Sequence, residues 1–155
     1  MTIRVADVSE AEVLVQLINT AFRIEKFFVD GDRINLAQVL ALFPKGEFLL
    51  ADGDGDGTHA GCAYVEQRGD HAYLGLLSID PARQRTGLGS RLVAAAEDWA
   101  RQRGCRFMDL RIVNLREELP LFYRRHGYVE DGTEPWPAEI PSKLPCHFIR
   151  MSKPL

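Results

Sequence analysis

The sequence predicts a single α/β domain, built on a mixed, mostly antiparallel central sheet with helices on both faces. The length of 155 residues suits one hydrophobic core. No internal repeat and no long linker divides residues 1–155. A short strand and two amphipathic helices precede an antiparallel meander, after which strands alternate with helices. One sheet covered on both sides is the simplest architecture for this order of elements.

The first 45 residues predict one strand and two helices. Alternating residues from Thr2 to Val5 indicate the strand, and Ser9 to Glu12 has the Ser-x-x-Glu pattern of a capping box. Apolar residues at helical spacing then mark one buried stripe in each helix. They are Leu14, Leu17, Ile18, Ala21 and Phe22 in the first helix, and Leu36, Val39, Leu40 and Phe43 in the second. Pro44 is expected to end the second helix.

Three strands joined by turns form the predicted meander. The strands are expected at Glu47–Ala51, Gly61–Gln67 and Ala72–Ile79. Glycine and aspartate fill both intervening turns, at Asp52–Gly57 and at Gly69 and Asp70. Asp80 and Pro81 break the third of these strands.

The second half of the chain alternates helices with strands. Leu88, Leu92 and Trp99 lie at helical spacing in a long helix, for which Gly104 is the expected C-terminal cap. The remaining predicted elements are a strand at Cys105–Val113, a short helix at Leu121–His126 that ends at Gly127, a strand that begins at Tyr128 and Val129, a loop at Glu134–Pro145 and a closing strand at Cys146–Met151.

Composition and charge argue against nucleic-acid and membrane partners. The formal net charge is −3 and the pI is about 5.8, without the basic excess that is usual in nucleic-acid-binding proteins. No stretch approaches the roughly 18 apolar residues that span a bilayer. The N-terminus lacks the apolar core of a signal peptide. We therefore expect a cytoplasmic protein that binds neither nucleic acid nor membranes.

Neither the cysteines nor the acidic residues predict a metal site. Cys62, Cys105 and Cys146 lie far apart and form no Cys-x-x-Cys pair, so reduced thiols are expected. The Gly-Asp run that begins at Asp52 resembles the start of a calcium-binding loop. Its twelfth position is Ala63, however, where such a loop requires a bidentate Glu. We expect no metal.

The most informative segment runs from Leu76 to Leu92, where a strand ends, a basic loop turns and a helix begins at glycines. Glycine allows the backbone to approach a ligand closely and to adopt positive φ. The first amides of a helix have no partner within the helix, and they lie at the positive end of its dipole. Together these features predict a binding site for a pyrophosphate group.

Three phosphate-binding patterns can be compared with this segment. The P-loop string Gly-x-x-x-x-Gly-Lys-Ser/Thr is absent from the sequence. The dinucleotide fingerprint is a weak match, because Leu92 stands where its third glycine is required. Gln84 to Gly89, in contrast, resembles the Gln/Arg-x-x-Gly-x-Gly/Ala signature of the GNAT superfamily of acetyltransferases. The preceding residues Leu77 to Pro81 resemble the end of its fourth strand, and with the helices and meander the resemblance covers most of the chain.

The resemblance implies acetyl-CoA as the cofactor. In such proteins the fourth strand splays from the fifth, often at a β-bulge, and pantetheine pairs with strand backbone in the gap. The cofactor contacts implied at the strand end are Leu77, Ser78 and Ile79. Those implied for the pyrophosphate are Gln84, Arg85, Thr86, Gly87, Leu88, Gly89 and Ser90. The side chains of Arg83, Arg85 and Arg91 are expected to screen the phosphate charge.

A second segment, Leu121 to Tyr128, resembles the Leu/Phe-Tyr-x-x-x-Gly-Phe/Tyr stretch of the same family. The resemblance places the hydroxyl of Tyr123 toward the CoA sulfur, where a phenol can protonate the departing thiolate as general acid. Many relatives carry a cofactor-binding Asn seven residues before this tyrosine, a position that is Arg116 here. Asn114 lies two residues earlier, and Pro120 is expected to interrupt the helix, so the contact either moves to Asn114 or is lost.

The implied reaction is N-acetyl transfer, in which a primary amine of a small molecule or peptide attacks the acetyl thioester directly. The backbone amide of Ile79 is the expected oxyanion donor. The general base stays unassigned, because Tyr73 occupies the position at which histone-type relatives carry Glu. The available candidates are Glu25, Glu66, Asp80, His71 and His147. Glu25 is the most interesting of them, because the loop between the first two helices usually lines the acceptor cleft.

Two other function classes compete with the enzyme. A non-catalytic acyl-CoA-binding or sensing domain of the same fold would keep the loop without the chemistry. A nucleotide-binding regulatory module is disfavoured by the missing third glycine and the missing Walker lysine. The acceptor and the oligomeric state are open, although pairing of C-terminal strands in this fold makes a homodimer possible.

Overall fold

The sheet is mixed and mostly antiparallel, as the sequence predicts. The computed structural model describes residues 2–53, 55 and 57–155. In this part of the chain the seven strands have the spatial order β1-β2-β3-β4-β5-β7-β6. Their bounds are β1 Ile3–Val5, β2 Glu47–Asp52, β3 His59–Arg68, β4 His71–Ile79, β5 Phe107–Val113, β6 Val129–Pro135 and β7 His147–Pro154. The β4–β5 pair is parallel, and the other neighbouring pairs are antiparallel.

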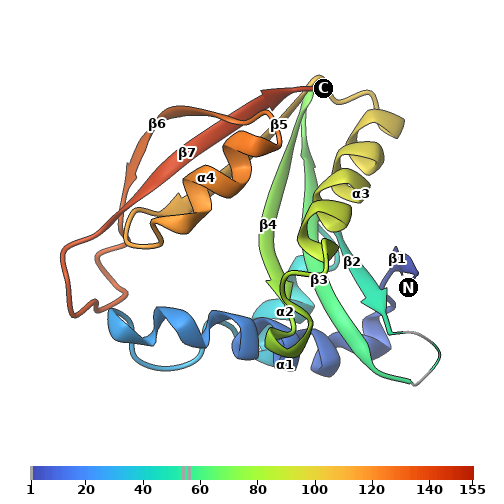
Figure 1. The fold of residues 1–155 in the computed structure, drawn as a ribbon, viewed down its shortest axis with the longest axis horizontal. Coiled ribbons are helices and arrows are strands. Elements are labelled where there is room, and N and C mark those ends of the chain that lie inside the picture. The colour runs from blue at the N-terminus through green and yellow to red at the C-terminus, as the bar shows by residue number, and fades with distance from the viewer. Residues whose placement is uncertain (1, 54, 56) are drawn as a thin grey trace.

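Helices cover both faces of the sheet (Figure 1). On one face, α1 Ala11–Ala21 and α2 Leu36–Leu42 pack on β2 and β3, joined by the 3-10 helix η2 at Phe22–Phe27. On the other face, α3 Leu88–Gln102 and α4 Glu118–Arg125 lie beside each other. Two apolar cores result, one under each helical layer. Among the described residues, no helix is long and apolar enough to span a bilayer.

The N-terminal capping box lies two residues earlier than predicted. The N-cap is Asp7, not Ser9. The Asp7 carboxylate accepts a hydrogen bond from the Ser9 amide at 2.9 Å, and the Glu10 carboxylate accepts one from the Asp7 amide at 2.9 Å. This box opens the 3-10 turn η1 at Val8–Glu10, and α1 follows from Ala11. The Glu10 carboxylate also accepts two hydrogen bonds from the guanidinium of Arg4 in β1, at 2.9 and 2.7 Å, which favours this capping box over the one at Ser9.

Pro120 does not interrupt the helix that carries Tyr123, which corrects the prediction. Helix α4 begins at Glu118, so Pro120 is its third residue. Proline is tolerated in the first turn, because the amides there have no intrahelical partner. Gly104 and Gly127 have φ of +77° and +91° and follow α3 and α4, as predicted for helix ends.

Strands β4 and β5 diverge after a short paired stretch, as the family resemblance implies. Pairing is limited to His71–Tyr73 with Phe107–Asp109. Further along β4, Leu76 has φ of +54°, a left-handed conformation that is uncommon for a branched residue. The register with β3 shifts at this point, since Tyr64 pairs with Gly75 and Cys62 with Ser78. The extra residue forms a β-bulge that turns the end of β4 away from β5.

At the open end of this gap, the loop between β6 and β7 contacts η2 through a hydrogen bond from the Lys143 ammonium to the Lys26 carbonyl at 3.1 Å (Figure 1). The Lys143 amide donates to the Phe28 carbonyl at 2.7 Å, and the Lys143 ammonium lies 2.8 Å from the Asp30 carboxylate. The Trp136 ring meets the Phe28 ring edge-on, with centroids 6.1 Å apart. The gap is therefore bounded by β4 and β5 along its sides and by η2 and this loop at its open end.

Candidate active site

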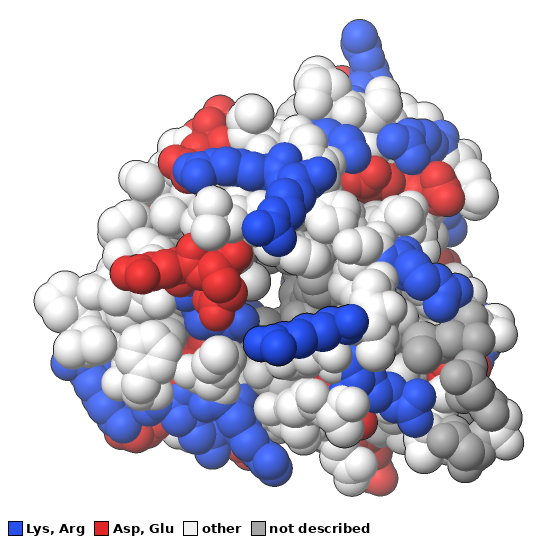
Figure 2. Space-filling model, viewed as in Figure 1, with Lys and Arg blue, Asp and Glu red and all other residues white. Residues whose placement is uncertain are grey.

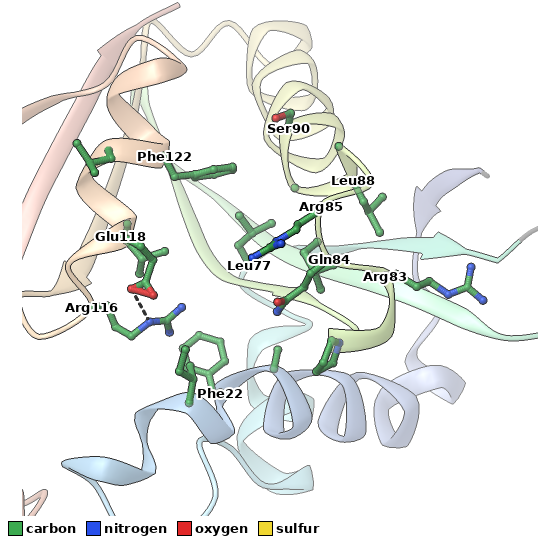
Figure 3. Close-up of a pocket in the computed structure, with 18 of the residues that line it drawn as sticks. Phe22, Leu77, Arg83, Gln84, Arg85, Leu88, Ser90, Arg116, Glu118 and Phe122 are labelled. Atoms are coloured by element: carbon green, nitrogen blue, oxygen red, sulfur yellow. Dashed lines mark hydrogen bonds and ion pairs between the residues drawn. The ribbon is translucent and has the colours of Figure 1, made fainter.

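A cavity of about 950 Å³ opens where the ends of β4, α3, α4 and η2 meet. Figure 3 shows its walls: the loop before α3 on one side, Arg116 and Glu118 on the other, and Phe22 between them. Figure 2 shows the same hollow from outside, with basic side chains on both sides of it. The cavity thus joins elements from the first and the second half of the sequence.

The wall formed by the loop before α3 is shaped by local hydrogen bonds. The Asp80 carboxylate accepts from the Ala82 amide at 3.0 Å, and the Thr86 hydroxyl donates to the Arg83 carbonyl at 2.7 Å. Arg85 and Gly87 both adopt positive φ, of +67° and +81°. These turns bring the chain onto the start of α3 in a compact bend.

The N-terminus of α3 offers unpaired amides to the cavity. Its N-cap is Gly87, which has no side chain to cap the helix. The first bond back to the cap runs from the Arg91 amide to the Gly87 carbonyl at 3.1 Å. The amides of Leu88, Gly89 and Ser90 therefore precede the hydrogen-bonded ladder, at the positive end of the helix dipole. This arrangement suits an anionic group such as a pyrophosphate.

Arginine side chains add positive charge, though not all those expected to do so face the cavity. In Figure 3 the Arg85 side chain points into the cavity, whereas Arg83 points away from it. The Arg83 guanidinium donates to the Thr58 hydroxyl at 2.7 Å, which holds it on the outer side of the loop. Arg116 and Arg125, which the prediction of phosphate contacts missed, line the opposite wall.

Helix α4 closes the cavity next to the start of α3. A Cβ added to Gly89 would lie 3.3 Å from Cζ of Phe122, so glycine leaves only just enough room between the helices. The Nδ1 of His126 lies 2.8 Å from the Phe122 carbonyl oxygen, and its Nε2 lies 2.8 Å from the Ser90 hydroxyl. Because the carbonyl can only accept, Nδ1 carries the proton and Nε2 accepts from Ser90 in the neutral ring. Sequence reasoning did not select His126.

The end of β4 presents a free edge toward the cavity. Leu77 and Ile79 line the cavity, while Ser78 is buried and its hydroxyl donates to the Leu76 carbonyl at 2.9 Å. The Asp80 amide donates to Ala60 of β3 at 2.9 Å. Because successive amides of a strand alternate in direction, the Ile79 amide points to the opposite edge, into the gap beside β5.

Tyr123 is not among the residues that line the cavity, and only 5% of its surface is exposed. Among the described residues its hydroxyl has no hydrogen-bond partner, yet none of these residues keeps a fully buried polar atom unpaired. The hydroxyl oxygen therefore reaches accessible space. Burial raises the pKa of Tyr123, the nearby Tyr73 raises it further, and Arg116 opposes both. The phenol therefore stays protonated at neutral pH.

The structure places Arg116, and not Asn114, at the cavity. The Asn114 carboxamide oxygen accepts from the His147 amide at 2.8 Å, and the Asn114 amide donates to the His147 carbonyl at 2.9 Å. The backbone bond extends the β5–β7 ladder by one residue, and the side-chain bond reinforces it. The side chain of Asn114 is thereby committed to the sheet, whereas Arg116 is among the residues that line the cavity.

Arg116 binds two carboxylates. Its Nη1 lies 3.0 Å from Oε2 of Glu25, and its Nε lies 3.1 Å from Oε1 of Glu118. The Glu25 and Arg116 side chains are 14% and 15% exposed, so this ion pair is largely removed from water. Burial raises the pKa of Glu25, although the charge of Arg116 acts in the opposite direction. A carboxyl group with a raised pKa beside a cavity is suited to proton transfer.

Comparison with known proteins shows one consistent family. The model of the Acetyltransferase (GNAT) family matches residues 13–128. The chain is 35% identical over 88 residues to a mycothiol acetyltransferase of Clavibacter sepedonicus, a match that covers 57% of this chain and 29% of that protein. The chain thus spans less than a third of the length of the curated relatives that it matches.

Solved structures share the fold at low sequence identity. The ribosomal-protein-S18-alanine N-acetyltransferase from Escherichia coli has a TM-score of 0.77 and 16% identity, over 99% of this chain and 92% of that chain. A protein from Bacillus anthracis, provisionally described as a streptothricin acetyltransferase, was solved in complex with acetyl coenzyme A. It has a TM-score of 0.62 and 19% identity, over 72% of this chain and 64% of that chain.

Proposed function

The chain belongs to the GNAT acetyltransferase family, and from this premise we propose that it is an acetyl-CoA-dependent N-acetyltransferase. It moves the acetyl group to a primary amine of a small molecule or peptide by direct attack on the thioester. The observation that carries the proposal is the cavity itself, in which the unpaired amides of α3 lie next to the free edge of β4. The first suits a pyrophosphate and the second suits the amide groups of pantetheine.

The cofactor would lie along this wall. Its pyrophosphate rests on the amides of Gln84 to Ser90, with Arg85 directed toward it. Its pantetheine extends into the gap beside Leu77 and Ile79, where β4 has no pairing with β5. This placement brings the thioester to the junction beside Tyr123 and Arg116.

The chemistry then depends on three groups of this chain. The Ile79 amide, which points into the gap, donates to the oxyanion that forms when the amine attacks. The Tyr123 hydroxyl, protonated because burial raises its pKa, donates its proton to the thiolate of the leaving CoA. The amine must lose a proton before or during attack, and we take Glu25, which pairs with the cavity-lining Arg116, as the base that accepts it.

Replacing Glu25 by glutamine is expected to lower kcat/KM at neutral pH by about 100-fold, since general bases contribute roughly that much or more. The base must be ionised, so the wild-type rate should decline as the pH falls through the pKa of Glu25. Because burial raises this pKa, the decline occurs at higher pH than for an exposed carboxylate. The variant should lose this acid limb, which a pH profile of kcat/KM measures.

Glu118→Gln is the matched control for Glu25→Gln. It removes the other carboxylate from Arg116 while leaving the Glu25 pair in place. The acid limb should persist in this variant. A limb that persists in Glu25→Gln as well would exclude Glu25 as the base.

The proposal is tested first by calorimetric titration with acetyl-CoA, followed by thiol release with a panel of amines. One-site binding with thiol release supports the enzyme. One-site binding without turnover on any amine would instead favour the second candidate, a non-catalytic acyl-CoA-binding domain. The buried position of Tyr123 favours this candidate, because a buried tyrosine can serve packing alone. Absence of binding at high micromolar acetyl-CoA would reject both.

A further inference from the structure

A short chain of hydrogen bonds joins the end of α4 to the first turn of α3. The Nδ1 of His126 lies 2.8 Å from the Phe122 carbonyl oxygen, and its Nε2 lies 2.8 Å from the Ser90 hydroxyl oxygen. Both Ser90 and His126 line the cavity, and Figure 3 shows Ser90 in the part of α3 that follows the loop with Arg85. The chain therefore ends beside the unpaired helix amides that suit a pyrophosphate.

The imidazole ring of His126 is fixed in its orientation. His126 is the C-cap residue of α4, its ring is half-buried, and the Phe122 ring lies beside it with centroids 4.6 Å apart. Because the Phe122 carbonyl oxygen can only accept, Nδ1 carries a proton in both charge states of the ring. Only Nε2, which faces Ser90, gains or loses a proton.

The charge of His126 decides which way the Ser90 hydroxyl donates. In the neutral ring Nε2 accepts from Ser90, so the hydroxyl proton is used within the protein and an oxygen lone pair is left toward the cavity. In the imidazolium Nε2 donates to the Ser90 oxygen, and the hydroxyl proton can then be donated to a group in the cavity. The first arrangement repels a phosphate oxygen, whereas the second attracts it.

Cationic side chains predominate on the elements that meet around this ring. They are Arg85 in the loop before α3, Arg91 in α3, Arg124 and Arg125 in α4, and Lys153 in β7. Carboxylates of α3, α4 and β6 are bonded to cations, in the pairs Glu97–Lys153, Glu118–Arg116 and Glu130–Arg124. Within residues 2–53, 55 and 57–155, no carboxylate forms an ion pair with His126. Like charges disfavour the imidazolium while the site is empty, and a bound anion reverses this preference.

We propose that His126 takes up one proton from water when acetyl-CoA binds, and that Ser90 then donates its hydroxyl proton to the pyrophosphate. The inference rests on the proposed placement of the cofactor and adds a residue that couples its affinity to pH. Imidazolium, hydroxyl and pyrophosphate form one charge-assisted chain. Because binding favours the protonated ring, affinity is greatest at low pH, where the ring is already protonated, and declines as the pH rises.

The S-acetylated form of dephospho-CoA is the probe that isolates this effect. The 3′-phosphate of acetyl-CoA is a monoester, and such groups have their own second ionisation at a pKa of about 6. The probe lacks this group and has no free thiol, while its pyrophosphate keeps a fixed charge. Binding is measured calorimetrically between about pH 6 and pH 8, the range in which histidines change charge. Two buffers of different ionisation enthalpy then give the number of protons taken up.

The wild-type protein is expected to bind the probe about 10-fold more weakly at the upper end of this range than at the lower end. This is the effect of one charge-assisted hydrogen bond. Part of one proton should be taken up on binding near neutral pH. Affinity that is constant across the range, with no proton uptake, would overturn the inference.

His126→Gln removes the charge while keeping a side chain that can donate and accept. At the low end of the pH range it should bind the probe as weakly as the wild type does at the high end, without proton uptake. His59→Gln is the matched control, because His59 pairs with Asp52 at 3.1 Å and is not among the residues that line the cavity. This control should keep the full pH dependence. Loss of the dependence in both variants, or in neither, would assign the proton to another group.

A double-mutant cycle tests the relay through the Ser90 hydroxyl. If Ser90 transmits the charge, the losses of affinity in His126→Gln and Ser90→Ala are not additive, and the double variant binds about as well as either single variant. Additive losses would show that the two side chains act independently, which contradicts the relay. Ser90→Ala should also lower the pH dependence by itself, so the relay is tested even if His126→Gln does not fold.

These measurements need no amine and no turnover, so they separate this inference from the acetyl-transfer proposal. Binding with proton uptake but without acetylation of any amine supports the role of His126, even though the enzymatic proposal then fails. Acetyl transfer by a protein whose affinity for the probe does not depend on pH leaves the enzyme in place and overturns the role of His126. Absence of binding rejects both.

Discussion

Replacing Gly89 by leucine is expected to lower the affinity for acetyl-CoA by about 100-fold, or roughly 2.8 kcal/mol at 1.4 kcal/mol per decade. A Cβ at this position already lies 3.3 Å from Phe122, so a larger side chain must extend into the space above the first turn of α3. That space is where the pyrophosphate would contact the helix amides. Calorimetric titration of wild type and variant gives the difference in the dissociation constant.

The control for Gly89→Leu is Ala94→Leu, which adds the same bulk to the same helix at an exposed position. Its affinity for acetyl-CoA should equal that of the wild type. Melting temperatures of both variants show whether either substitution unfolds the protein. A folded Gly89→Leu protein with undiminished affinity would place the cofactor elsewhere.

Replacing Tyr123 by phenylalanine is expected to lower kcat by about 100-fold, the lower range for loss of a general acid. The change removes one hydroxyl that has no hydrogen-bond partner among the described residues, so little packing is lost. Affinity for acetyl-CoA should stay the same, because the pyrophosphate and pantetheine contacts lie elsewhere. Steady-state thiol release and calorimetry separate the two quantities.

Tyr128→Phe is the matched control for this substitution. The Tyr128 ring packs against that of Tyr123 with centroids 5.7 Å apart, but its hydroxyl donates to the buried Glu97 at 2.8 Å. Loss of this hydroxyl should reduce the free energy of unfolding by about 1 kcal/mol while leaving kcat near the wild-type value. If both variants lose activity in proportion to their stability, Tyr123 has only a packing role.

The fold and the bend before α3 could be predicted from the sequence because their signals are local. The strand end at Ile79, the bend through Gly87 and the start of α3 lie within a dozen residues, where spacing and residue type restrict the backbone directly. The ends of α3 and α4 were equally predictable, since Gly104 and Gly127 adopt the positive φ that a helix terminus requires.

Other features depend on contacts between distant segments, which spacing does not encode. Both Asp7 and Ser9 have a glutamate three residues later, and the bond from Arg4 to Glu10 decides between the two capping boxes. Asn114 is held by His147 of β7, a partner visible only once the strands are paired. Glu25 could be named as a candidate base from the sequence, but its partner Arg116 lies 91 positions away and became visible only in the structure.

The contact of the β6–β7 loop with Phe28 also gives the two sides of the site unequal local stability. Strand β6 is exposed along most of its length, and the loop is fastened to η2 by a few hydrogen bonds and one aromatic contact. The wall made by β4 and α3, in contrast, is part of a continuous apolar core. Segments with few buried contacts open at lower free-energy cost than the global fold. We therefore expect thermal fluctuations to open the side formed by η2 and the β6–β7 loop first, while the side formed by β4 and α3 stays folded.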